Sequence, residues 1–118
     1  MSKFKNLRIW QESRQITIEI FNIFRNSKEF SIKDQILRAT ISIINNIAEG
    51  CEAGSDNLFV RYLQIAKGSC AEVKSMLYIS EDLGLCEPKQ AEELRIKINQ
   101  NILSIQKMIQ YLKKNKPN

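Results

Sequence analysis

The hydrophobic positions of this 118-residue chain recur at three- and four-residue steps, which is the spacing of amphipathic helices. The pattern predicts four helices, over about residues 6–26, 31–50, 56–83 and 88–113. Because all three connections are short, sequential helices should lie antiparallel. The sequence therefore predicts an all-α fold, an up-down-up-down antiparallel four-helix bundle, as a single domain over residues 1–118.

Capping residues set the expected helix boundaries. Ser31 is the expected N-cap of the second helix, and Ser55 or Asp56 that of the third. Gly84 follows as a C-cap glycine, and Pro88 stands where a first-turn proline belongs.

The first helix shows a three- and four-residue spacing of large side chains. This spacing predicts a core face made of Leu7, Trp10, Thr17, Phe21 and Phe24.

The segment QILRATISIINNIAEG, residues 35–50, is apolar over most of its helical circumference but carries one polar line. At about 100° per residue, the line contains Gln35, Arg38, Ser42, Asn46 and Glu49. Apolar flanks on both sides of this line predict burial against two surfaces, one inside the bundle and one outside it. The polar line then serves structure and assembly or, alternatively, binds a ligand directly.

The third helix carries a second line opposite its core stripe, which includes Ile65, Gly68 and Glu72. A mid-helix glycine costs about 1 kcal/mol relative to alanine, and close approach of another backbone would explain it. The plain alternative is an incidental surface glycine. We expect the second and third helices to form a subunit contact, with Glu72 as a candidate partner for Arg38.

Composition argues against catalysis. The chain has no histidine, and its three cysteines match no metal or redox spacing, so we expect reduced thiols, no cofactor, no metal and no enzymatic activity. No run reaches the roughly 18 apolar residues of a membrane span, and the N-terminus turns polar too soon for a signal peptide. The sequence therefore predicts a cytoplasmic protein that does not engage a membrane.

Four segments resemble the bacterial four helix bundle proteins, also called 23S rRNA intervening-sequence proteins. FKNLRIWQES is similar to the family's F-x-x-L-x-x-W-x-x-A, and QILRATISIINNIAEG to its Q-I-x-R-A-x-x-S-I-P-x-N-I-A-E-G. SDNLFVRYLQIAKGSCAEV and EDLGL resemble the motifs that follow. The chain departs at Ile44, where the family usually carries proline, and at Asn57–Leu58, where an acidic residue is common.

The resemblance implies a small cytosolic protein that assembles as a homopentameric ring without enzymatic activity. It also implies a relation to the accessory variability determinant of diversity-generating retroelements, which binds nucleic acid and partners a reverse transcriptase. By this resemblance the expected partners are a second copy of the chain, RNA or DNA, and a reverse transcriptase or another protein.

Charge is unevenly distributed in the predicted bundle. The end that holds both termini carries eight cationic side chains against three acidic ones, whereas the opposite end carries five against seven. The residues expected to contact nucleic acid are Lys3, Lys5, Arg8, Lys107, Lys113, Lys114 and Lys116. Lysines bind phosphate as point charges, without reading sequence. A solvated, solubilising surface is the plain alternative, and Phe4 and Trp10, which interleave with these cations, are expected to pack rather than stack on bases.

Two functions follow from these observations. The first is a homo-oligomeric scaffold that binds RNA or DNA nonspecifically through its basic end. The second is a protein–protein interaction module with no role in nucleic-acid binding, in which the acidic end or the ring is the docking surface.

Overall fold

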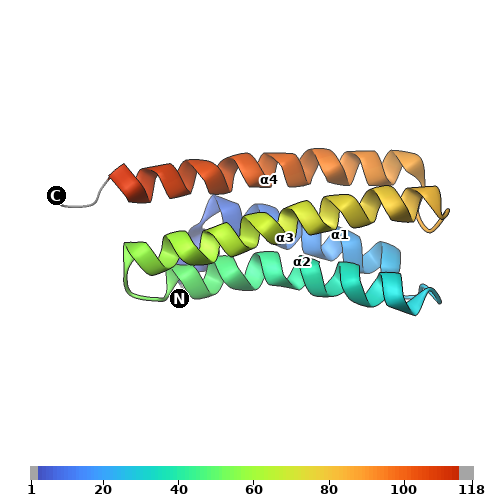
Figure 1. Cartoon of the computed structure of the whole chain (residues 1–118), viewed down its shortest axis with the longest axis horizontal. Coiled ribbons are helices and arrows are strands. Elements are labelled where there is room, and N and C mark those ends of the chain that lie inside the picture. Colours follow the sequence, from blue (N-terminus) through green and yellow to red (C-terminus); the bar gives the residue numbers. More distant parts are fainter. Residues whose placement is uncertain (1–2, 115–118) are drawn as a thin grey trace.

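The computed structural model describes residues 3–114, which form helices joined by short turns (Figure 1). A short 3-10 helix, η1, spans Lys3–Asn6 and leads into α1. The four long helices are α1 (Arg8–Phe24), α2 (Phe30–Cys51), α3 (Asp56–Asp82) and α4 (Pro88–Lys114). Each long helix packs on two others, α1 on α2 and α4, and α3 on α2 and α4. The predicted all-α, antiparallel four-helix bundle is confirmed.

The bundle is elongated, with extents of 51 × 23 × 21 Å. Its interior is filled mainly by isoleucine and leucine from all four helices. The largest side chains with almost no solvent exposure include Ile20, Ile43, Leu63 and Ile98, one from each helix. Within residues 3–114, no helix has a stretch long and apolar enough to cross a bilayer.

The core face predicted for α1 is wrong. The structure buries Ile9, Ser13, Ile16, Ile20 and Phe24, a face rotated by about a quarter turn from the predicted one. The other four predicted residues are only half-buried. Both stripes lie within one wide apolar face of α1, so periodicity alone does not choose between them. Isoleucines and Phe24 fill the centre, whereas Trp10 and Phe21 lie at its margin.

The structure confirms three of the four residues that were predicted to begin or end helices. The Leu58 backbone N–H donates to Ser55 Oγ at 3.1 Å, so Ser55 is the N-cap of α3. Gly84 adopts φ of 73°, and the bond from Leu85 N–H to Ser80 O at 2.8 Å closes the helix end, as in a Schellman motif. Pro88 is the first residue of α4.

The expected Ser31 cap is wrong. The N-cap position of α2 is Glu29, which makes no side-chain capping bond, so Ser31 is the second residue of the helix. Ser27 Oγ instead accepts the Glu29 N–H at 3.3 Å, which stabilises the turn before α2.

Both ends of the described chain lie at one end of the bundle, together with the turn between α2 and α3 (Figure 1). The turns between α1 and α2 and between α3 and α4 lie at the other end. This arrangement brings the start of α1 beside the last turns of α4.

Candidate nucleic-acid interface

Six of the seven expected cationic residues lie at this shared end, and all six are exposed. Lys3 and Lys5 belong to η1, and Arg8 is the first residue of α1. Three more, Lys107, Lys113 and Lys114, lie in the last two turns of α4. The seventh, Lys116, lies outside the described residues. We call this end of the bundle the basic end.

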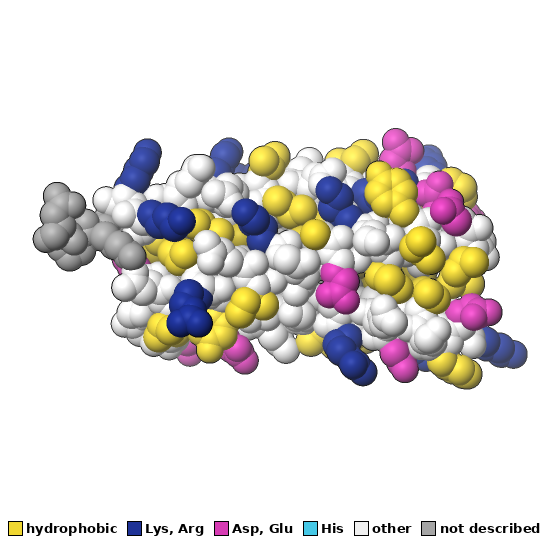
Figure 2. Space-filling model, viewed as in Figure 1, with side chains coloured by type: hydrophobic (Ala, Val, Ile, Leu, Met, Phe, Trp, Pro, Cys, Tyr) yellow, Lys and Arg dark blue, Asp and Glu magenta, His cyan; other side chains and the backbone are white. Residues whose placement is uncertain are grey.

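Side chains, rather than helix dipoles, give the basic end its charge. In an antiparallel bundle the N-termini of α1 and α3 and the C-termini of α2 and α4 meet at one end, so their partial charges largely cancel. On the face shown in Figure 2, lysine and arginine side chains are spread along the bundle with several at the upper left, while most acidic side chains lie toward the right-hand end.

A groove crosses the seam between α1 and α4 at the basic end. It encloses about 430 Å³ and is lined by Arg8, Ile9, Ser104, Lys107, Met108 and Tyr111. The four α4 residues recur at steps of three, one and three, so they share one face of that helix. Ile9 is buried and forms the floor, whereas Tyr111 is 61% exposed and forms a wall. The groove thus combines an apolar floor, an aromatic face and two cations.

A polar network lies directly beneath the groove. Glu12 accepts a hydrogen bond from Ser104 Oγ and another from Asn101 Nδ2, both at 3.1 Å, and Arg8 Nε lies 3.4 Å from its carboxylate. Asn101 is fully buried and also donates to the Ile9 carbonyl at 3.1 Å. Both carboxylate oxygens are therefore engaged, which offsets the negative charge that would otherwise repel an anion here.

The two aromatic side chains that interleave with the N-terminal cations, Phe4 and Trp10, pack against each other. The ring centroids of Phe4 and Trp10 lie 5.2 Å apart, and Trp10 is half-buried against the core. Their expected packing is therefore observed. Tyr111 is the exposed aromatic residue that sequence reasoning missed, although its place among Lys107, Lys113 and Lys114 was a signal for it.

The polar line of α2 divides into two parts. Ser42 Oγ shares a hydrogen bond of 2.8 Å with Ser69 Oγ of α3, and Asn46 Nδ2 donates to the Ser42 carbonyl at 2.7 Å. These residues are half-buried, apart from Ser69, which is buried. The inner part of the line therefore holds α2 against α3.

The outer part of the polar line faces solvent in the single chain. Its residues Gln35, Arg38 and Glu49 are exposed, as is Glu72 of α3. Within residues 3–114, Arg38 forms no ion pair with Glu72 or any other carboxylate.

The second line of α3 is also exposed. Ile65 is 52% exposed, and a Cβ atom added at Gly68 would meet no heavy atom within 4 Å. The close backbone approach expected at Gly68 therefore does not occur inside the chain. The tightly packed glycine is Gly50, which sequence reasoning missed. A Cβ atom there would lie 2.8 Å from Tyr62 Cβ and 2.9 Å from Phe59 Cδ1.

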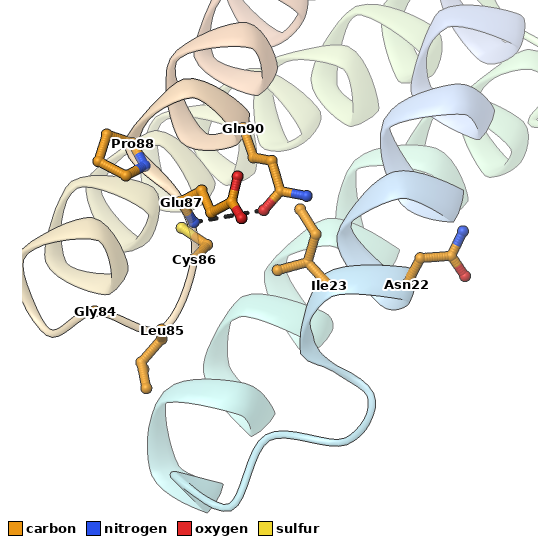
Figure 3. A pocket seen from close by; sticks show the side chains of 8 residues that line it. All are labelled: Asn22, Ile23, Gly84, Leu85, Cys86, Glu87, Pro88 and Gln90. Carbon is orange, nitrogen blue, oxygen red and sulfur yellow. Dashed lines mark hydrogen bonds between the residues drawn. The ribbon is translucent and has the colours of Figure 1, made fainter.

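A second hollow lies at the opposite end, between the end of α1 and the α3–α4 turn (Figure 3). It has a volume of about 610 Å³, and Asn22, Ile23 and Gln90 lie along it. Gln90 Oε1 accepts the Glu87 N–H at 3.4 Å, the dashed contact in Figure 3, so this side chain is already used to cap α4. The hollow offers a single ionised group, Glu87, and no pair of groups suited to catalysis.

The three cysteines are free thiols. Burial raises the pKa of Cys70 to about 12, and it also raises the pKa of Cys51 and of Cys86. A raised pKa lowers the thiolate fraction near neutral pH, which argues against a nucleophilic role. Across the part of the chain that the structure describes, no three histidine, cysteine or acidic side chains gather as a metal site would require.

Comparisons with known proteins agree on one family. Residues 5–111 match the model of the family described as 23S rRNA-intervening sequence protein. A crystal structure from Bacteroides thetaiotaomicron, described as a protein with unknown function from the S23 ribosomal protein family, superposes with a TM-score of 0.81 at 25% sequence identity. The match covers 86% of this chain and 97% of that one. No curated protein matches the chain.

Proposed function

The chain belongs to the 23S rRNA-intervening sequence protein family, and we propose that it is a non-enzymatic homo-oligomeric scaffold that binds RNA or DNA through its basic end. Binding is electrostatic and independent of sequence. Assembly of several copies in a ring, a pentamer by resemblance, presents several basic ends on one face.

One observation carries the nucleic-acid part of the proposal. Within the described residues, the basic end exposes Arg61 and the six cations named above against three exposed acidic side chains and the partly buried Glu12, and the structure brings Arg8 of α1 beside Lys107 of α4. These two residues lie about 100 positions apart in the chain. Clustered cations displace the counterions of a phosphate backbone, and the released counterions favour binding.

Two features support assembly through α2 and α3. Both helices expose apolar side chains away from the core, including Ile41, Leu58 and Ile65. A hollow of about 280 Å³ lies among Leu58, Arg61, Tyr62 and Ile65 on α3, and its volume is large enough for an apolar side chain from a second copy. Exposed apolar surface beside unpaired polar groups is typical of a specific subunit contact.

The binding test is a salt series with labelled RNA and duplex DNA. Lys107→Glu, Lys113→Glu and Lys114→Glu together should weaken binding to every sequence and reduce the slope of log K against log salt by about 3. A matched control makes the same charge change at the opposite end, with Lys28→Glu, Lys33→Glu and Lys89→Glu. No binding at low salt, or equal loss in both variants, would contradict a role for the basic end.

The assembly test uses light scattering. Ile65→Asp places a charge on the proposed contact and should shift the protein toward smaller species. The control is Leu103→Asp on α4, a residue that is equally exposed but lies away from α2. A monomeric wild-type protein, or full-size assemblies with Ile65→Asp, would contradict the proposed contact.

A further inference from the structure

We infer that the groove between α1 and α4 binds one unpaired nucleobase, so that the protein prefers single-stranded nucleic acid to duplex. This inference rests on the proposed function, which by itself requires only phosphate contacts. It names the substrate class within nucleic acids and the side chains that select it.

Tyr111 provides the surface on which a base can stack. Its ring is 61% exposed, and it stands over the buried Ile9 and the half-buried Met108. A base in the groove would contact the aromatic face on one side and apolar side chains below. Stacking on aromatic side chains tolerates every base, because each base has a π-face. The geometry therefore supports binding without sequence preference.

The cations around the groove fit the backbone that must accompany the base. Arg8 comes from α1 and Lys107 from α4, so the two positive charges approach the groove from different helices. Arg8 is 86% exposed in its side chain, and its ion pair to Glu12 uses Nε, which leaves the terminal nitrogens directed at neither carboxylate oxygen. Two cations beside an aromatic face match a nucleotide better than an apolar peptide, which would leave both charges without a partner.

Ser104 adds a polar contact at the groove wall. Its hydroxyl proton is directed to Glu12 at 3.1 Å, so the oxygen retains lone pairs that can accept an N–H group from a base edge. The hydrogen bond also fixes the rotation of the hydroxyl. In a single strand the Watson–Crick edge of the base is free to donate to this acceptor, whereas in a duplex that edge is already hydrogen-bonded.

Duplex nucleic acid does not satisfy this groove. Its bases are stacked and paired, and extracting one has an energetic cost that single strands largely avoid. The basic end can still contact duplex phosphates, which predicts weaker and more salt-dependent binding. A strand that lacks bases but keeps its phosphates should behave like the duplex.

The test compares three probes of equal phosphate count by fluorescence anisotropy: a single-stranded oligonucleotide, an abasic strand and a hairpin duplex, each as RNA and as DNA. Wild-type protein should bind the single strand tightest. Tyr111→Ala should weaken that binding about 5- to 150-fold and leave the abasic strand and duplex unchanged. Tyr111→Phe keeps the ring and should bind almost as wild type.

A matched control is Tyr78→Ala, which removes another tyrosine that is about as exposed, on α3. It should leave all three affinities unchanged. If the wild type binds single strand, abasic strand and duplex equally, or if Tyr111→Ala changes nothing, the inference is wrong while the proposed function stands. If no probe binds at low salt, both fail together. A tyrosine effect seen with RNA alone would restrict the site to RNA.

Discussion

Two helix seams of the same bundle are built in opposite ways. Between α2 and α3, small residues allow close approach, with Gly50 against Tyr62 and Phe59, and Ser42 bonded to Ser69 at 2.8 Å. Between α1 and α4, the contacts are long polar side chains that reach across the gap. These include Lys97 to Glu19 at 2.7 Å and the network around Glu12.

The difference has a simple origin in connectivity. A short turn joins α2 to α3, so their ends are held together by the chain, whereas α1 and α4 are the first and last helices and nothing but side chains joins them. Long side chains bridge those two helices at the surface, and the groove beneath Tyr111 lies along the same seam. The close α2–α3 seam therefore holds those two helices together, whereas the polar α1–α4 seam carries the groove proposed above as a binding surface.

The largest effect should come from removing the buried amide side chain of Asn101, which lies at the polar seam between α1 and α4. Asn101→Ala deprives Glu12 and the Ile9 carbonyl of their donor and leaves a cavity, since Asn101 is fully buried. We expect the free energy of unfolding to fall by about 2–4 kcal/mol, from the unsatisfied polar groups together with the lost packing. Urea denaturation measures it.

The control for this change is Asn99→Ala, two residues away on the exposed face of the same helix. It makes the same substitution without burial, so it should alter stability by less than about 0.5 kcal/mol. If the two variants lowered the free energy of unfolding equally, the hydrogen bonds of Asn101 would contribute nothing to the stability of the α1–α4 seam.

The next effect tests the close seam with two glycines. Gly50→Ala places a Cβ atom 2.8 Å from Tyr62 Cβ, which forces the helices apart and should cost about 1–3 kcal/mol. Gly68→Ala enters open space within the chain and should stabilise an isolated subunit by up to about 1 kcal/mol through helix propensity. Thermal unfolding of both variants gives the comparison, and a neutral Gly50→Ala would show that the seam is less close than the structure indicates.

The four-helix fold could be predicted because periodicity and capping agreed along the chain. The Ser55 cap and the Gly84 turn follow from local chemistry, and both are observed. The rotation of α1 could not be predicted, because both stripes lie within one apolar face of that helix. Which of two stripes faces inward depends on the shapes of the other three helices, and the sequence of α1 alone does not contain that information.

The candidate site was only partly predictable for a related reason. The uneven distribution of charged residues located the basic end, because the bundle topology determines which residues share an end. Tyr111 and Asn101 were missed because each has its role only once α1 lies beside α4. In the sequence, Tyr111 looks like any other exposed residue of α4. Residue spacing likewise does not distinguish a buried asparagine such as Asn101 from an exposed one.

The smallest effects concern the single cross-helix contacts of the two seams, which differ in how they respond to salt. Glu19 and Lys97 are partly exposed, so a double-mutant cycle with Glu19→Ala and Lys97→Ala should give a coupling energy of roughly 0.2–1 kcal/mol at low ionic strength. At 1 M salt, where the screening length is about 3 Å, most of it should disappear. The corresponding cycle with Ser42→Ala and Ser69→Ala involves neutral hydroxyls and should give a coupling of about 0.5–1.5 kcal/mol at any salt concentration. Stabilities from urea denaturation at both ionic strengths supply all the values. If salt weakens the two couplings alike, the seams do not differ in kind, and the groove has to be explained by something other than the polar contacts that line it.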